Sequence, residues 1–192
     1  MHIYDDEFVH GELPMTKQEV RAVSIAKLRL KEDSVLIDVG AGTGTIGIEA
    51  ATYLKDGKVI GIEKEEKGLE VIRANVKKFN LENYYLIHGR APQDIPETNY
   101  DRMFIGGSTG GMKEIVEHFI KYSKPDSRLV INAITLETLN SAMIILKEKG
   151  FNNIEVVNMS VSRGRKVGPY TMMYGENPIY IITAVKEEIV NE

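Results

Sequence analysis

The chain has 192 residues and a net charge of −4, with 24 Lys and Arg against 28 Asp and Glu. This length is enough for one domain with a sizeable core and is short for two. The acidic balance argues against a nucleic-acid partner, and the absence of cysteine excludes disulfides, thiolate catalysis and cysteine-ligated metal. No apolar stretch reaches membrane-spanning length, and residues 1–6 do not resemble a signal peptide. We therefore expect a cytoplasmic protein with no membrane partner.

Strands and helices are predicted to alternate over the first 150 residues. Thr16–Glu19 has the pattern of a capping box, which predicts Thr16 as the N-cap of a helix that reaches Leu30. A strand at 35–39 and a helix from Thr45 to the Asp56-Gly57 turn follow. Further strands are expected at 58–62, 84–88, 101–105 and 129–134, and further helices at 69–79, 112–122 and 136–149. This alternation is typical of βαβ units around a parallel sheet.

The pattern changes after Gly150. Residues 154–161 and 178–185 are strand-like, but three glycines and a proline between residues 164 and 175 leave no room for a crossover helix. A parallel pair needs such a crossover, so these two strands should pair antiparallel. The predicted α/β fold is Rossmann-like: a mostly parallel seven-stranded sheet with an antiparallel C-terminal hairpin and helices on both faces.

A glycine-rich loop follows the first strand. Residues 40–44 read Gly-Ala-Gly-Thr-Gly, and glycine both permits positive φ and lets a ligand approach the backbone. The helix from Thr45 would bring its N-terminus to the same place. The glycines fit two patterns: G-x-G-x-G, common in S-adenosylmethionine enzymes, at Gly40, Gly42 and Gly44, and the dinucleotide pattern G-x-G-x-x-G at Gly42, Gly44 and Gly47. Either one predicts a nucleotide-cofactor site.

Two carboxylates bear on the identity of the cofactor. Glu63 ends the second strand, where an acid can accept hydrogen bonds from ribose hydroxyls; the alternative is a solvated helix start. Asp38 lies just before the glycine loop, where it would favour the ammonium and sulfonium of S-adenosyl-L-methionine over a pyrophosphate. Its alternative role is a structural acid that holds a loop amide. The antiparallel C-terminal strands also favour the methyl donor over a dinucleotide.

Five segments spread over the chain carry a resemblance. They read PMTK at 14–17, DVGAGTG at 38–44, FIGGS at 104–108, NAITLETL at 132–139 and GPYTM at 168–172. With them the sequence resembles the class I methyltransferases and, more narrowly, the decarboxylating precorrin methyltransferases of cobalamin synthesis. The resemblance implies one methyltransferase domain over 1–192, with an N-terminal segment and helix (1–33), a cofactor-binding core (34–150) and a C-terminal hairpin (151–192).

The resemblance also implies an activity. The reaction would methylate C-15 of cobalt-precorrin-6B and remove carbon dioxide from its ring C acetate, giving cobalt-precorrin-7. The enzyme would be a homotetramer. A separate C-5 methyltransferase is a possible partner. No residue is singled out as catalytic, and no metal site is expected. The residues implied to contact S-adenosyl-L-methionine, together with Asp38 from the argument above, are Thr16, Asp38, Gly40, Ala41, Gly42, Thr43, Gly44, Glu63 and Ala91.

A basic run precedes the last strand. Because guanidinium groups match carboxylates bidentately, we expect Arg163, Arg165 and Lys166 to bind the carboxylates of the tetrapyrrole substrate while Tyr170 packs on the ring. The alternative is a solvated hairpin tip or a subunit contact. The rival functions are an isoaspartyl-type O-methyltransferase, another protein or small-molecule O-methyltransferase, a methyltransferase-fold RNA-binding protein and a dehydrogenase.

Overall fold

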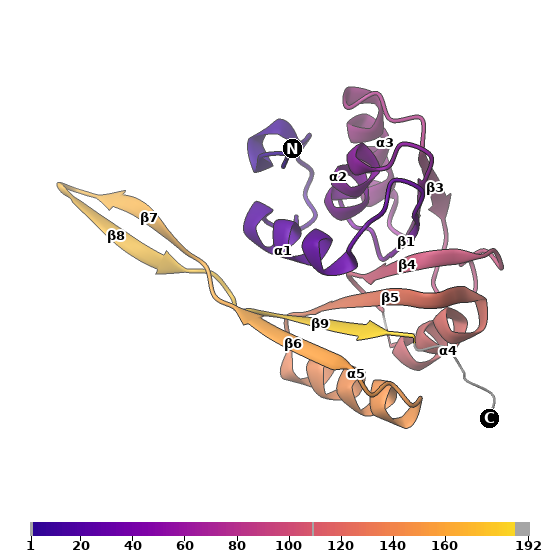
Figure 1. The fold of residues 1–192 in the computed structure, drawn as a ribbon. Coiled ribbons are helices and arrows are strands. Elements are labelled where there is room, and N and C mark those ends of the chain that lie inside the picture. Colours follow the sequence, from indigo (N-terminus) through magenta and orange to yellow (C-terminus); the bar gives the residue numbers. More distant parts are fainter. Residues whose placement is uncertain (1, 109, 187–192) are drawn as a thin grey trace.

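A single seven-stranded sheet organises the chain (Figure 1). The computed structural model describes residues 2–108 and 110–186. The strand order is β3-β2-β1-β4-β5-β9-β6; β1 to β5 are parallel, and β9 is antiparallel to both of its neighbours. The strands of this sheet are β1 Val35–Val39, β2 Lys58–Glu63, β3 Tyr84–His88, β4 Tyr100–Ile105, β5 Ser123–Ala133, β6 Ile154–Met159 and β9 Ile179–Val185. This confirms the predicted fold class.

Helices cover both faces of the sheet, as predicted. On one face α1 (Gln18–Leu28), α2 (Thr45–Tyr53) and α3 (Glu66–Lys78) enclose a core that includes Leu36 of β1. On the other face α4 (Met112–Tyr122) and α5 (Leu136–Glu148) enclose a core that includes Ile37 and Val39. The alternation of Leu36 and Ile37 between the two cores follows from the two-residue period of a strand. None of the described helices is long and apolar enough to cross a membrane.

The start of α1 differs from the prediction. The helix begins at Gln18, its N-cap is Lys17, and no side chain caps it, so the predicted capping box with Thr16 as N-cap is wrong. The partner of Glu19 is instead Arg163, whose guanidinium donates to both carboxylate oxygens at 3.1 and 2.6 Å. A charge-assisted bidentate pair is stronger than a bond to a backbone amide, so the tertiary contact determines where Glu19 points.

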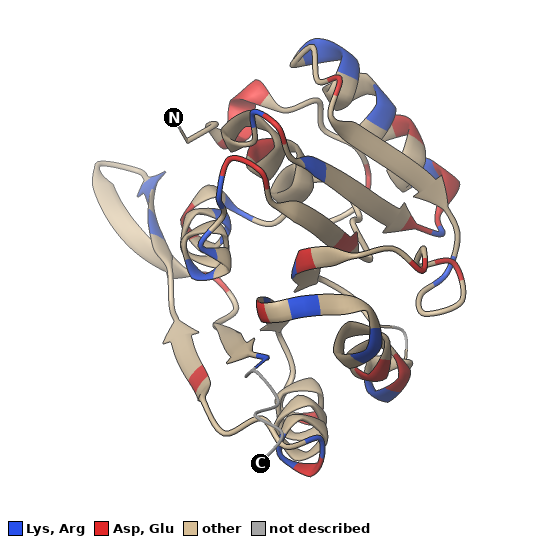
Figure 2. Cartoon of the chain, turned by 45° about the vertical axis from the view of Figure 1, so that its right-hand side comes forward, with Lys and Arg blue, Asp and Glu red and all other residues tan. Residues whose placement is uncertain are grey.

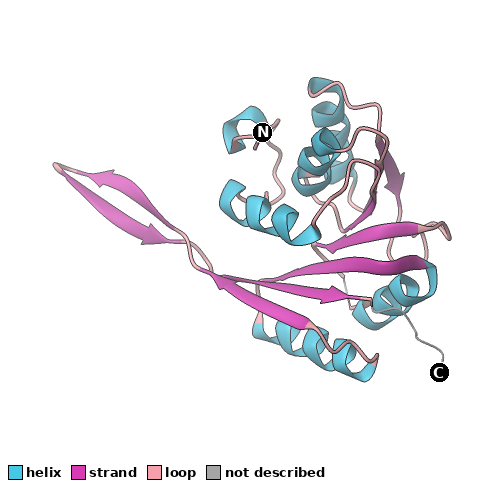
Figure 3. Ribbon diagram, viewed as in Figure 1, coloured by secondary structure: helices cyan, strands magenta, loops and turns pink. Residues whose placement is uncertain are grey.

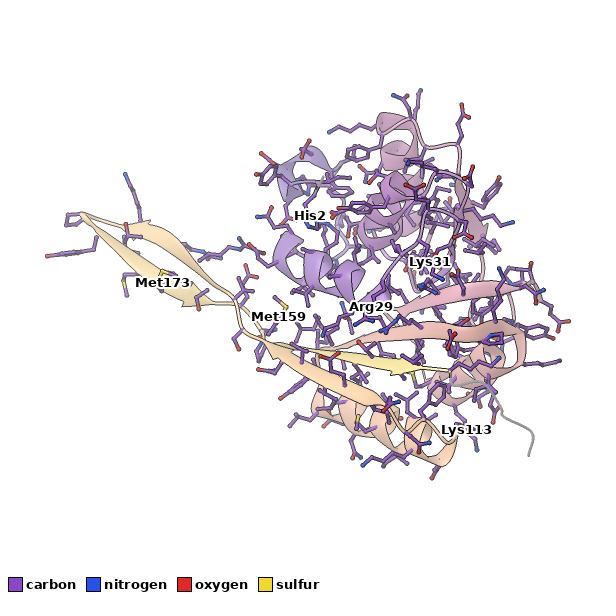
Figure 4. The ribbon with its side chains drawn as sticks, in the orientation of Figure 1. His2, Arg29, Lys31, Lys113, Met159 and Met173 are labelled. Carbon is purple, nitrogen blue, oxygen red and sulfur yellow. The ribbon has the colours of Figure 1, made fainter. Side chains whose placement is uncertain are left out.

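The segment between β6 and β9 forms a second, two-stranded sheet. β7 (Ser162–Val167) and β8 (Tyr170–Gly175) pair antiparallel in a ribbon that projects from the main sheet (Figures 1 and 3). No strand is predicted from the sequence of this segment. Both faces of the ribbon are exposed to solvent, so its sequence has no burial pattern to reveal it. Met173 is 66% exposed and lies about halfway along the ribbon (Figure 4).

The first residues form an N-terminal strap (residues 2–17) that packs against α1, α2 and the C-terminal end of α3. Phe8 of the strap is buried against Phe79, with ring centroids 5.3 Å apart. Arg21 of α1 is fully buried and holds the strap at both ends, since its guanidinium donates to the Ile3 carbonyl at 2.5 Å and to the Thr16 carbonyl at 2.7 Å. The charge of Arg21 is balanced by Glu49 of α2, at 2.6 Å. The strap is therefore a fixed part of the fold.

Candidate active site

Two adjoining cavities open on either side of the glycine loop, at the carboxyl ends of the parallel strands. Open α/β sheets bind their ligands at this edge. The smaller, the Glu63 cavity, has a volume of about 160 Å³ and is lined by residues that include Ile62, Glu63, Arg90, Ala91 and Gly107. The larger, the strap cavity, has a volume of about 460 Å³ and is lined by residues that include Met15, Thr16, Lys17, Gly42, Ile134 and Glu176. Gly40 lines both cavities, so the two spaces meet at the loop.

The three glycines of the loop all have positive φ, between 60° and 75°, but they serve different purposes. A Cβ on Gly40 would lie 2.5 Å from the carbonyl oxygen of Gly107, and one on Gly44 would lie 2.7 Å from Ile72. These two positions are glycine because protein packs against them. At Gly42 the nearest atom to such a Cβ is 4.0 Å away, so this glycine keeps the cavity wall open. The predicted reason, close approach of a ligand, therefore applies to Gly42.

Glu63 is buried beside the loop and accepts hydrogen bonds from three backbone N–H groups. Its Oε2 accepts a hydrogen bond from the backbone N–H of Gly42 at 2.7 Å, and its Oε1 accepts from the N–H groups of Lys64 and Glu65 at 2.8 Å each. A carboxylate offers about four acceptor positions, so these bonds leave about one for a ligand in the Glu63 cavity. The interpretation of Glu63 as the start of a solvated helix is wrong, because its side chain is 6% exposed and α3 begins at Glu66.

Asp38 lies beneath the loop rather than on a cavity wall. Its Oδ2 accepts a hydrogen bond from the N–H of Gly47 in α2 at 3.1 Å, and among the described residues it lines neither cavity. Burial raises the pKa of Asp38 to about 7; the bond from Gly47 opposes this shift, and the negative charge of Glu63 adds to it. The structure thus supports the alternative role, an acid that holds a backbone amide, and gives no support to the predicted contact with the methionine ammonium.

The other predicted cofactor residues, except Gly44, do lie on the cavity walls. Thr16, Ala41 and Thr43 line the strap cavity, and Ala91 lines the Glu63 cavity. Gly44 is the N-cap of α2 and packs against α3 instead. Thr16 reaches the cavity because Arg21 fixes the strap, which is a different reason from the capping role that the sequence predicted.

The root of the ribbon closes the far side of the strap cavity. Arg163 of β7 donates to Glu19 and, at 2.6 Å, to Glu176, and Glu176 itself lines the cavity. Hydrogen bonding to these two carboxylates raises the pKa of Arg163, and the same bond from Arg163 lowers the pKa of Glu19. Arg163 is therefore already paired with protein carboxylates. This cluster joins α1, the ribbon and the segment before β9 at the mouth of the cavity.

The remaining predicted substrate residues lie further out on the ribbon. The guanidinium of Arg165 lies 5.2 Å from the ring centroid of Tyr174, and Tyr170 is 73% exposed. Among the described residues, Arg165, Lys166 and Tyr170 line neither cavity. Their role in substrate binding remains a prediction. The ribbon strands carry basic residues and no acidic ones (Figure 2).

Sequence reasoning missed several residues of the strap cavity. Lys17, Ile134 and Glu176 all line it, and they come from three separate parts of the chain. Lys17 and Ile134 lie inside two of the segments that carried the resemblance, so a signal was present there. Nothing in the local sequence marks Glu176. Within the described residues there is no group of three or more His, Asp or Glu side chains placed to hold a metal ion.

Strand order, glycine loop and Glu63 together define a class I methyltransferase fold. Comparisons then specify the family. The sequence pattern of the precorrin methyltransferase domain matches residues 6–186, nearly the whole chain. The chain belongs to this family of precorrin methyltransferases.

Individual relatives agree with this assignment. A protein of Saccharolobus solfataricus described as a "probable cobalt-precorrin-6B C(15)-methyltransferase (decarboxylating)" is 41% identical over 179 residues, which cover 91% of this chain and 90% of that protein. The solved structure of a precorrin-6y C5,15-methyltransferase from Geobacter metallireducens is 40% identical with a TM-score of 0.87, covering 96% and 97% of the two chains. The precorrin 8w decarboxylase of Methanobacterium thermoautotrophicum is 31% identical, also with a TM-score of 0.87, covering 95% and 98%. The likeness extends over essentially the full length of each chain.

Proposed function

We propose that this enzyme uses S-adenosyl-L-methionine to methylate C-15 of cobalt-precorrin-6B and decarboxylates the ring C acetate side chain, releasing its carboxyl group as carbon dioxide and giving cobalt-precorrin-7. The observation that carries the proposal is the pair of cavities that meet at Gly40. One is small and walled by a carboxylate, and the other is larger and mostly apolar. A methyltransferase needs a donor site that adjoins its acceptor site; here the donor would span the Glu63 cavity and the loop side of the strap cavity, and the rest of the strap cavity would face the acceptor. The relatives named above favour this reaction over the O-methyltransferase and RNA-binding alternatives.

The residues around the glycine loop fit S-adenosyl-L-methionine. The positions that a Cβ would take at Gly42 and Gly107 are open, so a ligand can lie directly against the backbone. Glu63 and Ala91 would hold the adenosine in the Glu63 cavity, with a ribose hydroxyl donating to Glu63. Thr16 and the loop from Gly40 to Thr43 would hold the methionine part on the strap side. When bound, the cofactor supplies an electrophilic methyl group on sulfur.

The proposed reaction needs little general acid–base catalysis from the protein. A C–C bond forms between the methyl group and C-15 as the C–S bond breaks, and positioning the reactants can supply much of the rate. Loss of carbon dioxide leaves an electron pair on the former acetate carbon, which the conjugated ring delocalises until a proton from solvent completes a methyl group. The task of this chain is to bind both reactants at adjoining sites and to exclude water between them.

The test is mass spectrometry of the products after the protein is incubated with S-adenosyl-L-methionine and precorrin-6B, with and without cobalt in the ring. We expect the gain of one methyl group and the loss of one carbon dioxide. Isothermal titration of S-adenosyl-L-methionine against the protein provides a separate reading of the donor site. No heat at micromolar concentration, with no change in substrate mass, would overturn the proposal.

We further propose that the enzyme is a single-domain homotetramer that works in the cytoplasm, with a separate C-5 methyltransferase as a possible partner. The exposed apolar side chains of the ribbon, among them Tyr170, Met172 and Met173, support self-association, because surfaces of this kind commonly form protein interfaces. Native mass spectrometry of the purified protein tests this assembly. A monomer at micromolar concentration would contradict it.

A further inference from the structure

Two large aliphatic side chains lie exposed where β5 ends and α5 begins. Ile134 is 70% exposed and Leu136 is 65% exposed, the highest values for any Ile, Leu or Val among the described residues. Leaving such a side chain in water forgoes the free energy that its burial would provide. Exposed apolar groups that lie together commonly mark a binding surface.

The backbone presents the two side chains together. Thr135 between them is extended, with φ −120° and ψ 152°, so Ile134 and Leu136 point to the same side and Thr135 to the other. The Thr135 hydroxyl accepts a hydrogen bond from the N–H of Thr138 at 3.1 Å and caps α5. Before the turn, Asn132 forms hydrogen bonds with Ser24 of α1 at 3.0 and 3.1 Å. The pair therefore rests on a turn that is fixed on both sides.

The turn lies at the acceptor side of the proposed active site. Ile134 lines the strap cavity together with Gly42 of the glycine loop and Lys17 of the strap. Ala133, the residue before it, pairs with Tyr180 near the start of β9, the strand that follows the ribbon. Ile134 thus borders the cavity between the glycine loop and the root of the ribbon, and Leu136 extends the apolar surface outward from it.

We propose that Ile134 and Leu136 form the platform on which the flat apolar face of the tetrapyrrole lies during methyl transfer. This inference rests on the proposed function. A macrocycle has an extended apolar face and carboxylates at its periphery, which matches an aliphatic platform beside the cation of Lys17. Tyr170, the predicted ring contact on the ribbon, lines neither cavity among the described residues, whereas Ile134 lines the strap cavity itself.

The test compares Ile134→Asn, Leu136→Gln and the double variant with wild-type protein. The matched control is Ile144→Asn, because Ile144 is a 47% exposed residue of α5 that, within the described part of the chain, lines neither cavity. Uroporphyrin, a tetrapyrrole with eight carboxylates, serves as a stable probe in a fluorescence titration. The KM for cobalt-precorrin-6B is measured alongside it.

We expect each single variant to weaken uroporphyrin binding and raise that KM about tenfold, because it loses the contact of one aliphatic side chain with the ring. The double variant should lose both contacts and show a larger effect. The dissociation constant for S-adenosyl-L-methionine and the melting temperature should match those of the control. Unchanged uroporphyrin affinity and KM in the double variant would overturn the platform, as would wild-type protein that binds no uroporphyrin.

Two further outcomes separate this inference from the proposed function. If the double variant loses uroporphyrin affinity while wild-type protein fails to methylate the precorrin, the platform stands and the assigned reaction fails. If the double variant changes the assembly mass in native mass spectrometry while monomeric protein binds uroporphyrin normally, the patch is a subunit contact and the platform fails.

Discussion

The carboxylate of Glu63 at the end of β2 accepts a hydrogen bond from the backbone N–H of Gly42 at 2.7 Å. This bond ties the acid to the glycine loop, so the two parts of the proposed donor site are not independent. Glu63 fixes the shape of the loop and also forms part of a cavity wall. A change at Glu63 should therefore reach the methionine side of the site as well as the ribose side.

Replacement of Glu63 by Gln should weaken binding of S-adenosyl-L-methionine about 10- to 100-fold. The amide keeps the shape of the side chain, but it loses the charge that the N–H groups of Gly42, Lys64 and Glu65 contact, and hydrogen bonds to charged groups are worth about 1.5–3 kcal/mol. Titration calorimetry gives the dissociation constant. Glu65→Gln, at an exposed position of the same turn, is the control. Equal affinities of the two variants for S-adenosyl-L-methionine would show that Glu63 does not contribute to the donor site.

Alanine at Gly40 and at Gly42 should have different effects. Both positions have positive φ, which costs a residue with a Cβ about 1–2 kcal/mol. Only Gly40 adds a clash, because its Cβ would lie 2.5 Å from the Gly107 carbonyl oxygen. We expect Gly40→Ala to lower the melting temperature more, and Gly42→Ala chiefly to weaken binding of S-adenosyl-L-methionine. Calorimetric melting and titration measure the two effects, and equal melting temperatures would contradict the assignment.

The stability of the protein should depend on pH through Asp38. Its pKa is about 7 in the folded chain and about 3.9 in an unfolded one. Between these values the folded state keeps a proton that the unfolded state releases. The contribution of Asp38 to the free energy of unfolding is thus complete below about pH 4, falls by up to about 1.4 kcal/mol per pH unit as pH rises, and is lost above about pH 7.

The variant Asp38→Asn isolates this contribution. We expect its advantage in free energy of unfolding over wild-type protein to grow between pH 4 and pH 7 and then stay constant, as measured by denaturant titration at each pH. Binding of S-adenosyl-L-methionine should change little, because Asp38 holds Gly47 rather than a cavity wall. Parallel pH profiles would refute the buried titration, and a large loss of cofactor affinity would restore the predicted contact with the ammonium.

Charge reversal at Arg165 tests the ribbon as a substrate site. If the ribbon binds the carboxylates of the tetrapyrrole, Arg165→Glu should raise the KM for cobalt-precorrin-6B several-fold and spare the affinity for S-adenosyl-L-methionine. Lys113→Glu on α4, well away from the ribbon, controls for the change in net charge (Figure 4). Unchanged kinetics, alongside a raised KM in the Ile134 variant, would assign the substrate to the cavity rim alone.

The central strands of the main sheet could be predicted from the sequence because they are apolar runs that are buried on both faces, and the edge strand β3 is an apolar and aromatic run. The pattern of apolar residues at 35–39 and 84–88 gave strands whose bounds agree with β1 and β3. The glycine loop and Glu63 were also found, since both are short local patterns. The antiparallel pairing of β6 with β9 followed from the lack of a crossover helix between them. These features depend on local sequence and on general rules of chain connection.

Contacts between distant segments were decided only by the tertiary structure. Glu19 was a sound helix cap by local pattern, but Arg163, 144 residues away in the chain, binds it more strongly. The sequence predicted correctly that Asp38 lies next to the glycine loop. The direction of its side chain, however, is set by its hydrogen bond with Gly47, which depends on how α2 packs. The proposed platform of Ile134 and Leu136 could not be predicted from the sequence, because only the fold places Ile134 at the strap cavity. A sequence reports the local preference of each residue, whereas the direction of a side chain is the outcome of a competition among partners that only the folded chain brings together.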